Sequence, residues 1–185
     1  MFKRVHNNID LAKNEAKTAK YWDEINAFHK SVENRKDAKI FRFYDGPPFP
    51  TGSPHYGNLL AGVIKDIVPR YWTMRGFYVE RRFGWDVHGL PIEMEVQKEL
   101  GLEDPQQIDD YGIDKFNEAC RSQVQINTEN WERVTRKIGR WVDFDNDYKT
   151  MDLDFMESVW WVFKELWEND LIYKDYKVLP YSWAA

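Results

Sequence analysis

Cysteine is almost absent from this sequence, with one residue, Cys120, among 185. A single thiol excludes an internal disulfide and is typical of proteins from a reducing compartment. Cys120 lies in a polar run with helical character, and no metal-ligand partner stands near it. We therefore interpret it as a structural residue.

Long apolar runs and an excess of positive charge are also missing. No apolar run approaches the length that crosses a bilayer, and no signal peptide opens the chain, so we expect no membrane partner and a cytoplasmic location. The formal net charge is −5, so no overall field attracts nucleic acid. An RNA contact would need a local patch. The best candidates are Arg70, Arg75, Arg81 and Arg82, although a solvated surface is the commoner explanation of such a cluster.

Large aromatic side chains are what the chain has in plenty: 9 Trp, 10 Tyr and 11 Phe. They can fill a core or form the wall of a nucleotide or amino-acid pocket, and composition does not choose between these uses. The other proportions, 43% hydrophobic and 31% charged residues, are typical of a soluble globular protein.

The middle of the chain predicts a strand, a loop, a helix and a second strand. Residues 39–44 alternate as a strand does and end at the D-G-P-P of 45–48, where two prolines forbid a continued ladder. A turn-rich loop leads to a helix from about Pro54 to Arg75, which Pro69 should kink or interrupt. Residues 77–83 predict the second strand. This order is the minimal unit of a parallel α/β sheet.

Helical patterning flanks this unit on both sides. A polar connection with a proline and a glycine separates two of the later helices, and the tail alternates weakly, as a strand or an extended crossing would. The predicted helices are 9–34, 91–100, 113–140 and 152–169, the connection is 102–112, and the tail is 171–182.

The first group of candidate functional residues is S-P-H-Y-G-N at 53–58. The serine predicts an N-cap and the proline the first helical position, which puts His55 in the first turn with Asn58 on the same face. Free backbone N–H groups and the helix dipole would attract a phosphate there, and Gly57 would leave room for a flat ring. A capped helix with an exposed histidine is the commoner origin of so short a motif. Its place after a predicted strand favours a ligand site.

The second group is G-W-D-V-H-G-L-P-I-E at 84–93, directly after the second predicted strand and so beside the first loop. Asp86, next to a tryptophan in a glycine-bounded loop, is suited to hold an ammonium group, although a turn or N-cap carboxylate is a common alternative. His88 is either a ligand contact or a packed loop residue, and packing is the commoner role. His55 and His88 have no cysteine or further histidine at ligand spacing, so we predict no metal site.

Together these motifs resemble the class I aminoacyl-tRNA synthetases, and within that class the isoleucine-specific enzymes. The resemblance rests on D-G-P-P, on the H-x-G-x signature and on G-W-D-V-H-G-L-P-I-E about thirty residues later. It extends over almost the whole chain through K-S-V-E-N-R at 30–35, F-N-E-A-C-R at 116–121, W-V-D at 141–143 and E-S-V-W-W at 157–161.

The resemblance implies an α/β fold, the first half of a Rossmann-like nucleotide-binding domain with parallel strands and helices, plus helical segments at both ends. Residues 1–38 would be an N-terminal helical extension. Residues 39–185 would be the first half of the catalytic domain, truncated before an inserted editing domain. The last residues, 181–185, have no cap or terminating turn, as expected of an interrupted chain.

The resemblance also implies ATP-dependent activation of isoleucine to isoleucyl-adenylate and transfer of the aminoacyl group to tRNA(Ile), with Mg²⁺ accompanying ATP. His55 and Asn58 would be catalytic and would bind ATP phosphates or ribose within the signature from Pro48 to Asn58, and Gly57 would seat the adenine. The isoleucine amino group and its surroundings would be contacted by Gly46, Pro47, Asp86 and His88.

Two departures from the family pattern bear on these expectations. The signature normally ends in histidine, whereas Asn58 can donate a hydrogen bond but carries no charge. The second, lysine-rich signature is also missing from these residues, so the chain alone should have little or no activity. Two alternatives stay open: a valine or leucine enzyme of the same class, and a noncatalytic synthetase-like module that binds RNA or a protein partner.

Overall fold

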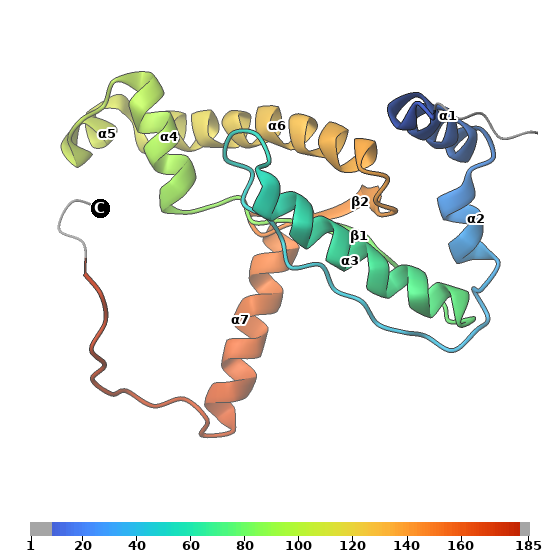
Figure 1. The fold of residues 1–185 in the computed structure, drawn as a ribbon. Helices are drawn as coiled ribbons and strands as arrows, with labels where there is room; N and C mark the ends of the chain where they lie inside the picture. The colour runs from blue at the N-terminus through green and yellow to red at the C-terminus, as the bar shows by residue number, and fades with distance from the viewer. Residues whose placement is uncertain (1–8, 182–185) are drawn as a thin grey trace, which may run out of the picture. The chain divides into compact units, whose positions relative to one another are not determined.

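The computed structural model describes residues 9–181, except for the side chains of Pro105 and Gln125. The chain forms two compact units, Met1–Thr150 and Met151–Ala185. Each is described by itself, and both are drawn in Figure 1. The expectation of an interrupted end falls mainly on residues 182–185, which lie outside the described part.

The first described part of the chain contains two helices, α1 (Leu11–Glu24) and α2 (Ala27–Glu33). Asp10 begins α1 as its N-cap and accepts the Lys13 N–H at 3.0 Å. The two helices replace the single predicted one because Asn26 takes a left-handed conformation, φ 51° and ψ 49°, which a helix does not continue through. The helical prediction is therefore confirmed for this segment, with a break that its sequence pattern did not indicate.

Helix α3 (Tyr56–Met74) is the long helix of the predicted central unit. It begins at Tyr56, two residues later than predicted, and runs through Pro69 without interruption. A proline removes one backbone hydrogen bond. Here the following turn is held by side chains, since the Thr73 hydroxyl donates to the Pro69 carbonyl at 2.7 Å and Arg81 donates to the same oxygen at 3.3 Å. Of the two effects expected of Pro69, a kink or an interruption, the interruption does not occur.

The sheet is small and parallel. Strands β1 (Arg82–Trp85) and β2 (Asp143–Lys149) pair in parallel, with Gly84 opposite Tyr148. The strand predicted at 39–44 forms only one parallel bridge, Ile40 to Tyr78, and the second predicted strand becomes regular only from Arg82. The parallel direction is confirmed.

Strand β2 was missed by the sequence patterns altogether. Its sequence, D-F-D-N-D-Y-K, contains four residues of the types that strands usually avoid. It forms because Phe144 is buried against Phe83 of β1, with ring centroids 4.5 Å apart, so tertiary packing outweighs local preference.

Three further helices complete the first unit: α4 (Leu90–Leu100), α5 (Pro105–Tyr111) and α6 (Ile113–Lys137). Helix α4 ends at Leu100, as predicted, and Gly101 with φ 68° caps it. Helix α5 occupies the predicted polar connection and was missed. Helices α4 and α5 both pack on α6. The buried core joins this layer to the strands through Val79, Phe83, Trp85, Val87, Ile92, Val96, Phe116, Val124, Trp131, Val142 and Phe144.

The second unit contains α7 (Leu153–Glu168), which matches the helix predicted at 152–169. The described part of the tail after it, to Tyr181, has no regular structure, so no strand forms there. Among the described residues no helix combines the length and the apolar character needed to span a membrane.

Gly84 makes the parallel pair possible, and its replacement gives the first prediction. The phenol ring of Tyr148 lies where a Cβ at position 84 would stand. We expect Gly84→Ala to lower the free energy of unfolding by about 1–3 kcal/mol, the usual cost of overpacking. Urea unfolding followed by circular dichroism measures this.

The matched control is Gly62→Ala, on buried helical backbone, where the added Cβ would lie 3.5 Å from Ile138 Cδ1, an ordinary contact. Alanine is the better helix former by about 0.5–1 kcal/mol, so this variant should be neutral or more stable. Equal losses in both variants would show that Tyr148 does not constrain position 84.

Candidate functional site

The loop that follows Tyr44 is anchored by a buried carboxylate. Asp45 is 1% exposed. Its Oδ1 lies 2.9 Å from Lys65 Nζ of α3, and its Oδ2 accepts from Arg140 Nη2 at 2.9 Å. A carboxylate out of water is stable only with such partners, because desolvation of a lone charge costs several kcal/mol. The sequence analysis used Asp45 only as part of the D-G-P-P motif and gave it no role, since nothing in the sequence identifies its two distant partners.

Three carbonyl groups of this loop are fixed by hydrogen bonds. The Tyr148 hydroxyl donates to the Asp45 carbonyl at 2.5 Å, and Lys65 Nζ donates to the carbonyl of Gly46. The Pro48 carbonyl accepts a backbone N–H, described below. Pro47 differs, since its carbonyl has no hydrogen-bond partner among the described residues. The loop therefore offers one free acceptor at Pro47, whereas the Gly46 carbonyl already has a donor.

The two predicted loops lie side by side. The backbone N–H of Asp86 donates to the Pro48 carbonyl at 2.9 Å, directly after β1 ends. The prediction that the second motif stands beside the first is thus confirmed.

His55 begins α3 as its N-cap and is not in its first turn. Its Nδ1 accepts the Gly57 N–H at 3.1 Å, and its own N–H donates to Asn58 Oδ1 at 3.0 Å. The predicted roles of Ser53 and Pro54 as N-cap and first helical residue are wrong. The physical reason is that the His55–Asn58 pair satisfies the free N–H groups at the helix start by itself.

This cap determines which hydrogen-bonding atoms remain. Because Nδ1 of His55 accepts, the neutral ring carries its proton on Nε2, which is left as a donor. Asn58 uses its carbonyl oxygen in the cap, so its NH₂ group is left as a donor as well. His55 is exposed and Asn58 half-buried. The start of α3 therefore presents two N–H donors together with the positive end of the helix dipole.

Gly57 has a local reason to be glycine. A Cβ at this position would lie 3.0 Å from Cε1 and 3.1 Å from Nδ1 of His55, closer than most real contacts. The missing side chain lets the imidazole fold back over the first turn.

Thr150, at the end of β2, holds the second motif in place. Its Oγ1 accepts the Val87 N–H at 3.0 Å, lies 2.8 Å from His88 Nδ1, and donates to Asp86 Oδ1 at 3.3 Å. Thr150 is 7% exposed, and its own N–H donates to the Trp85 carbonyl at 2.9 Å. Sequence reasoning missed it because it follows a strand that was itself not predicted.

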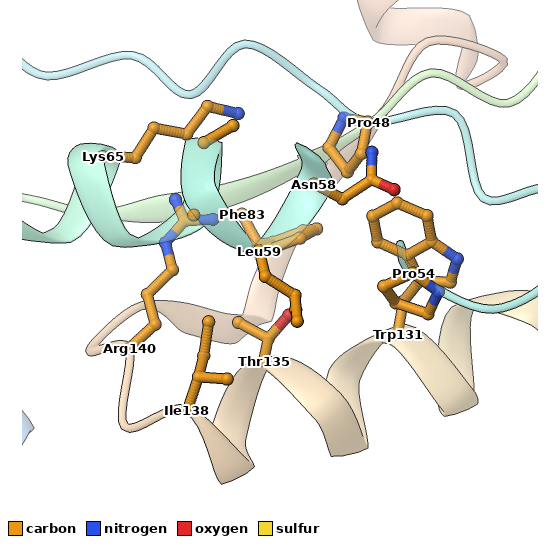
Figure 2. A pocket seen from close by; sticks show the side chains of 12 residues that line it. Pro48, Pro54, Asn58, Leu59, Lys65, Phe83, Trp131, Thr135, Ile138 and Arg140 are labelled. Carbon is orange, nitrogen blue, oxygen red and sulfur yellow. The ribbon is translucent and has the colours of Figure 1, made fainter. Parts of the chain in front are cut away.

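Helix α6 contacts the loop that leads into α3. Trp131 Nε1 donates to the Gly52 carbonyl at 3.0 Å, and Asn130 donates to Ser53 Oγ at 3.1 Å. A cavity of about 200 Å³ is lined by side chains of α3, of α6 and of the segments next to them. Figure 2 shows these side chains from close by. The lining of the cavity includes Pro48 and Asn58, so it adjoins the candidate site.

The four arginines proposed as an RNA patch do not form one. Arg81 is buried, and Arg70 is used internally: its guanidinium lies 4.1 Å from the Trp141 ring centroid and pairs with Asp66. Arg82 donates to the carbonyls of Asn146 and Asp147. Arg75 donates to Tyr71 Oη on the exposed end of α3. The burial of Arg81 therefore excludes a surface patch made of all four arginines.

Two further titratable groups behave as structural residues. Burial, followed by the nearby Glu93 charge, raises the pKa of Cys120, so the thiol is less reactive than a free one, in agreement with its predicted structural role. Burial, followed by Tyr44, raises the pKa of Tyr148, which keeps its hydroxyl a donor to Asp45. Within the described part of the chain, no three histidine, cysteine or acidic side chains come together as a metal site.

Comparisons with known proteins add the family. The sequence pattern of the tRNA synthetases class I (I, L, M and V) matches residues 17–185. This chain belongs to that family.

Among curated relatives, this class I synthetase chain is 54% identical to the isoleucine–tRNA ligase of Treponema denticola over 98% of its length, which covers 16% of the relative. It is 56% identical to that of Tetrahymena thermophila, with 98% of the chain and 17% of the relative covered. For Mycobacterium leprae the identity is 57%, with 91% and 16% covered. The chain thus spans about one sixth of the length of these relatives.

Among solved structures, the synthetase chain is similar to the Agrobacterium radiobacter K84 agnB2 LeuRS, crystallised as a ternary complex with tRNA and LeuAMS. The TM-score is 0.62 at 21% identity, over 91% of this chain and 19% of that one. At this identity the likeness concerns the fold, and it agrees with helices around a small parallel sheet.

Proposed function

We propose that this chain forms part of the adenylation site of an isoleucine–tRNA ligase. The reaction is the attack of the isoleucine carboxylate on the α-phosphorus of ATP, which gives isoleucyl-adenylate and pyrophosphate, followed by transfer to tRNA(Ile). The observation that carries the proposal is the bond between the Asp86 N–H and the Pro48 carbonyl, which joins the two motif loops. The identity of 54–57% to isoleucine–tRNA ligases favours isoleucine.

The fold proposed is the first half of a Rossmann-like domain, residues 39–185, with residues 1–38 as a helical extension. In open parallel sheets ligands bind at the carboxyl ends of the strands. The parallel pairing of β1 and β2 and the position of Asp86 directly after β1 support this assignment.

The amino-acid subsite proposed centres on Asp86 and Pro47. Asp86 offers a carboxylate and Pro47 a carbonyl without an internal donor, and both types of oxygen accept hydrogen bonds from an ammonium group. Gly46 contributes its backbone N–H and its lack of a side chain rather than its carbonyl, which Lys65 already occupies. His88, two residues after Asp86, would line the entrance.

The nucleotide subsite proposed lies at the start of α3. The Nε2–H of His55 and the NH₂ of Asn58 would donate to phosphate oxygens, whose negative charge moves during the reaction. Pro48 and the bare backbone at Gly57 would bound the adenosine. Mg²⁺ would arrive bound to ATP, tRNA(Ile) would bind mainly to parts of the enzyme outside this chain, and the protein would act in the cytoplasm.

The proposal is tested by grafting. Residues 1–181 replace the matching segment of the Treponema denticola ligase, and ATP–pyrophosphate exchange is measured with isoleucine, valine and leucine. We expect exchange that is fastest with isoleucine. The isolated chain should exchange poorly, because each missing preorganised donor costs about 2.7–4 kcal/mol. A graft that is folded but inactive, or that prefers another amino acid, would refute the assignment.

The cap and the donor role of His55 can be separated by two substitutions in the graft. His55→Asp keeps an N-cap acceptor but removes the Nε2–H donor, so stability should be retained and kcat for adenylation should fall by about 10²–10³-fold. His55→Ala should lose the same activity and also about 0.5–2 kcal/mol of stability. Full activity in His55→Asp would mean that the ring only caps the helix.

Asn58 provides the matched comparison at the other end of the cap. Asn58→Asp keeps the oxygen that accepts the His55 N–H but puts a negative charge where phosphates are proposed to bind, so KM for ATP should rise. Asn58→His restores the usual family residue and should cost much less. Steady-state adenylation with urea unfolding as the folding check measures both. A larger loss at Asn58→His than at His55→Ala would mean that the catalytic end of the helix is misassigned.

Asp86→Asn tests the amino-acid subsite. The change keeps size and an acceptor but removes the charge that faces an ammonium group, an interaction worth about 1.5–3 kcal/mol. KM for isoleucine should therefore rise about 10- to 100-fold while KM for ATP changes little. If instead KM for ATP rises alone, Asp86 belongs to the nucleotide subsite.

A further inference from the structure

A single hydroxyl, Oγ1 of Thr150, lies within hydrogen-bonding distance of three groups of the second motif. The distances are 3.0 Å to the Val87 nitrogen, 2.8 Å to His88 Nδ1 and 3.3 Å to Asp86 Oδ1. A threonine oxygen has two lone pairs and one hydrogen, so only certain combinations of these contacts are compatible.

The proton order follows from the partners. The Val87 N–H is a backbone donor and takes one lone pair of Oγ1. An ionised Asp86 has no hydrogen to give, so its 3.3 Å contact with Oγ1 is a hydrogen bond only if the threonine hydrogen points to it. His88 Nδ1 must then donate to the second lone pair. All groups are satisfied only in the order His88 Nδ1–H to Thr150, and Thr150 O–H to Asp86.

We propose that Thr150 is a positioning residue of the amino-acid subsite, which orients the Asp86 carboxylate and holds the neutral His88 ring in the form protonated on Nδ1. His88 Nε2 is then an acceptor, the opposite of His55, whose Nε2 is a donor. This inference rests on the proposed function for the role of Asp86, whereas the tautomer proposed for His88 is argued from the three contacts of Thr150 alone.

The proposed order places unlike groups in the two subsites. The donor at His55 Nε2 suits phosphate oxygens, which only accept hydrogen bonds. An acceptor at His88 Nε2, in the exposed loop after Asp86, suits the N–H groups of an ammonium and would not attract phosphate. Thr150 would thereby help keep the nucleotide and the amino acid in separate subsites.

The kinetic test uses the graft with Thr150→Val, which keeps the shape of the side chain and removes the hydroxyl. KM for isoleucine should rise about 10-fold, as for loss of one hydrogen bond to a charged group, with KM for ATP unchanged. Thr150→Ser, which keeps the hydroxyl, should restore KM. Thr73→Val is the matched control: Thr73 is equally buried at 6%, its hydroxyl bonds to Pro69 and Arg81, and KM should not change.

The second readout is independent of activity. In the full chain labelled with ¹⁵N-histidine, at about pH 8, where imidazole is neutral, His88 should show a protonated Nδ1 and His55 a protonated Nε2. In Thr150→Val, His88 should no longer be held in the tautomer protonated on Nδ1, whereas the tautomer of His55 should not change. An active graft in which Thr150→Val leaves KM for isoleucine unaltered, or a His88 protonated on Nε2 in the unsubstituted chain, would overturn the inference. An inactive unsubstituted graft would instead refute the proposed function.

Discussion

The first unit depends on one buried ion cluster. Asp45 is held between a cation on α3, Lys65, and a cation that follows α6, Arg140. Three segments far apart in the sequence thus meet at one carboxylate, and removal of any partner would leave a buried charge uncompensated. That penalty, commonly about 3–5 kcal/mol, makes the arrangement specific even where the net gain of the ion pairs is small.

The same cluster explains how flexible pieces form an ordered site. Two consecutive prolines give the 45–48 loop a restricted backbone, but they also deprive it of N–H groups with which to anchor itself. The anchoring comes from outside, through Tyr148, Lys65 and the Asp86 N–H. Three carbonyl groups of the loop are thus hydrogen-bonded, and the carbonyl of Pro47, which is not, is the one available to a ligand.

Sequence patterns predicted the long helices, the parallel direction of pairing and the adjacency of the two motif loops. These depend on local periodicity and on the position of motifs after strands. The patterns missed β2 and α5, and with β2 they missed Thr150. The acidic strand β2 is stabilised by the packing of Phe144 on Phe83 of β1. Such a contact between distant residues is not visible in the local sequence pattern. The start of α3 was misplaced because His55, an uncommon N-cap, took the role that Ser53 would ordinarily fill.

Helix α3 also sets a limit on how this region can vary in length. Its first residue follows the His55 cap, and Lys65, in the middle of the helix, forms an ion pair with Asp45. Each residue of an α-helix turns the chain by about 100°, so one inserted or deleted residue between these points would swing Lys65 away from its carboxylate or turn the imidazole away from the site. The segment from His55 to Lys65 can therefore tolerate substitutions but not insertions or deletions. In related chains that keep both Asp45 and the capping histidine, the lysine should therefore stand ten positions after that histidine, as Lys65 does after His55.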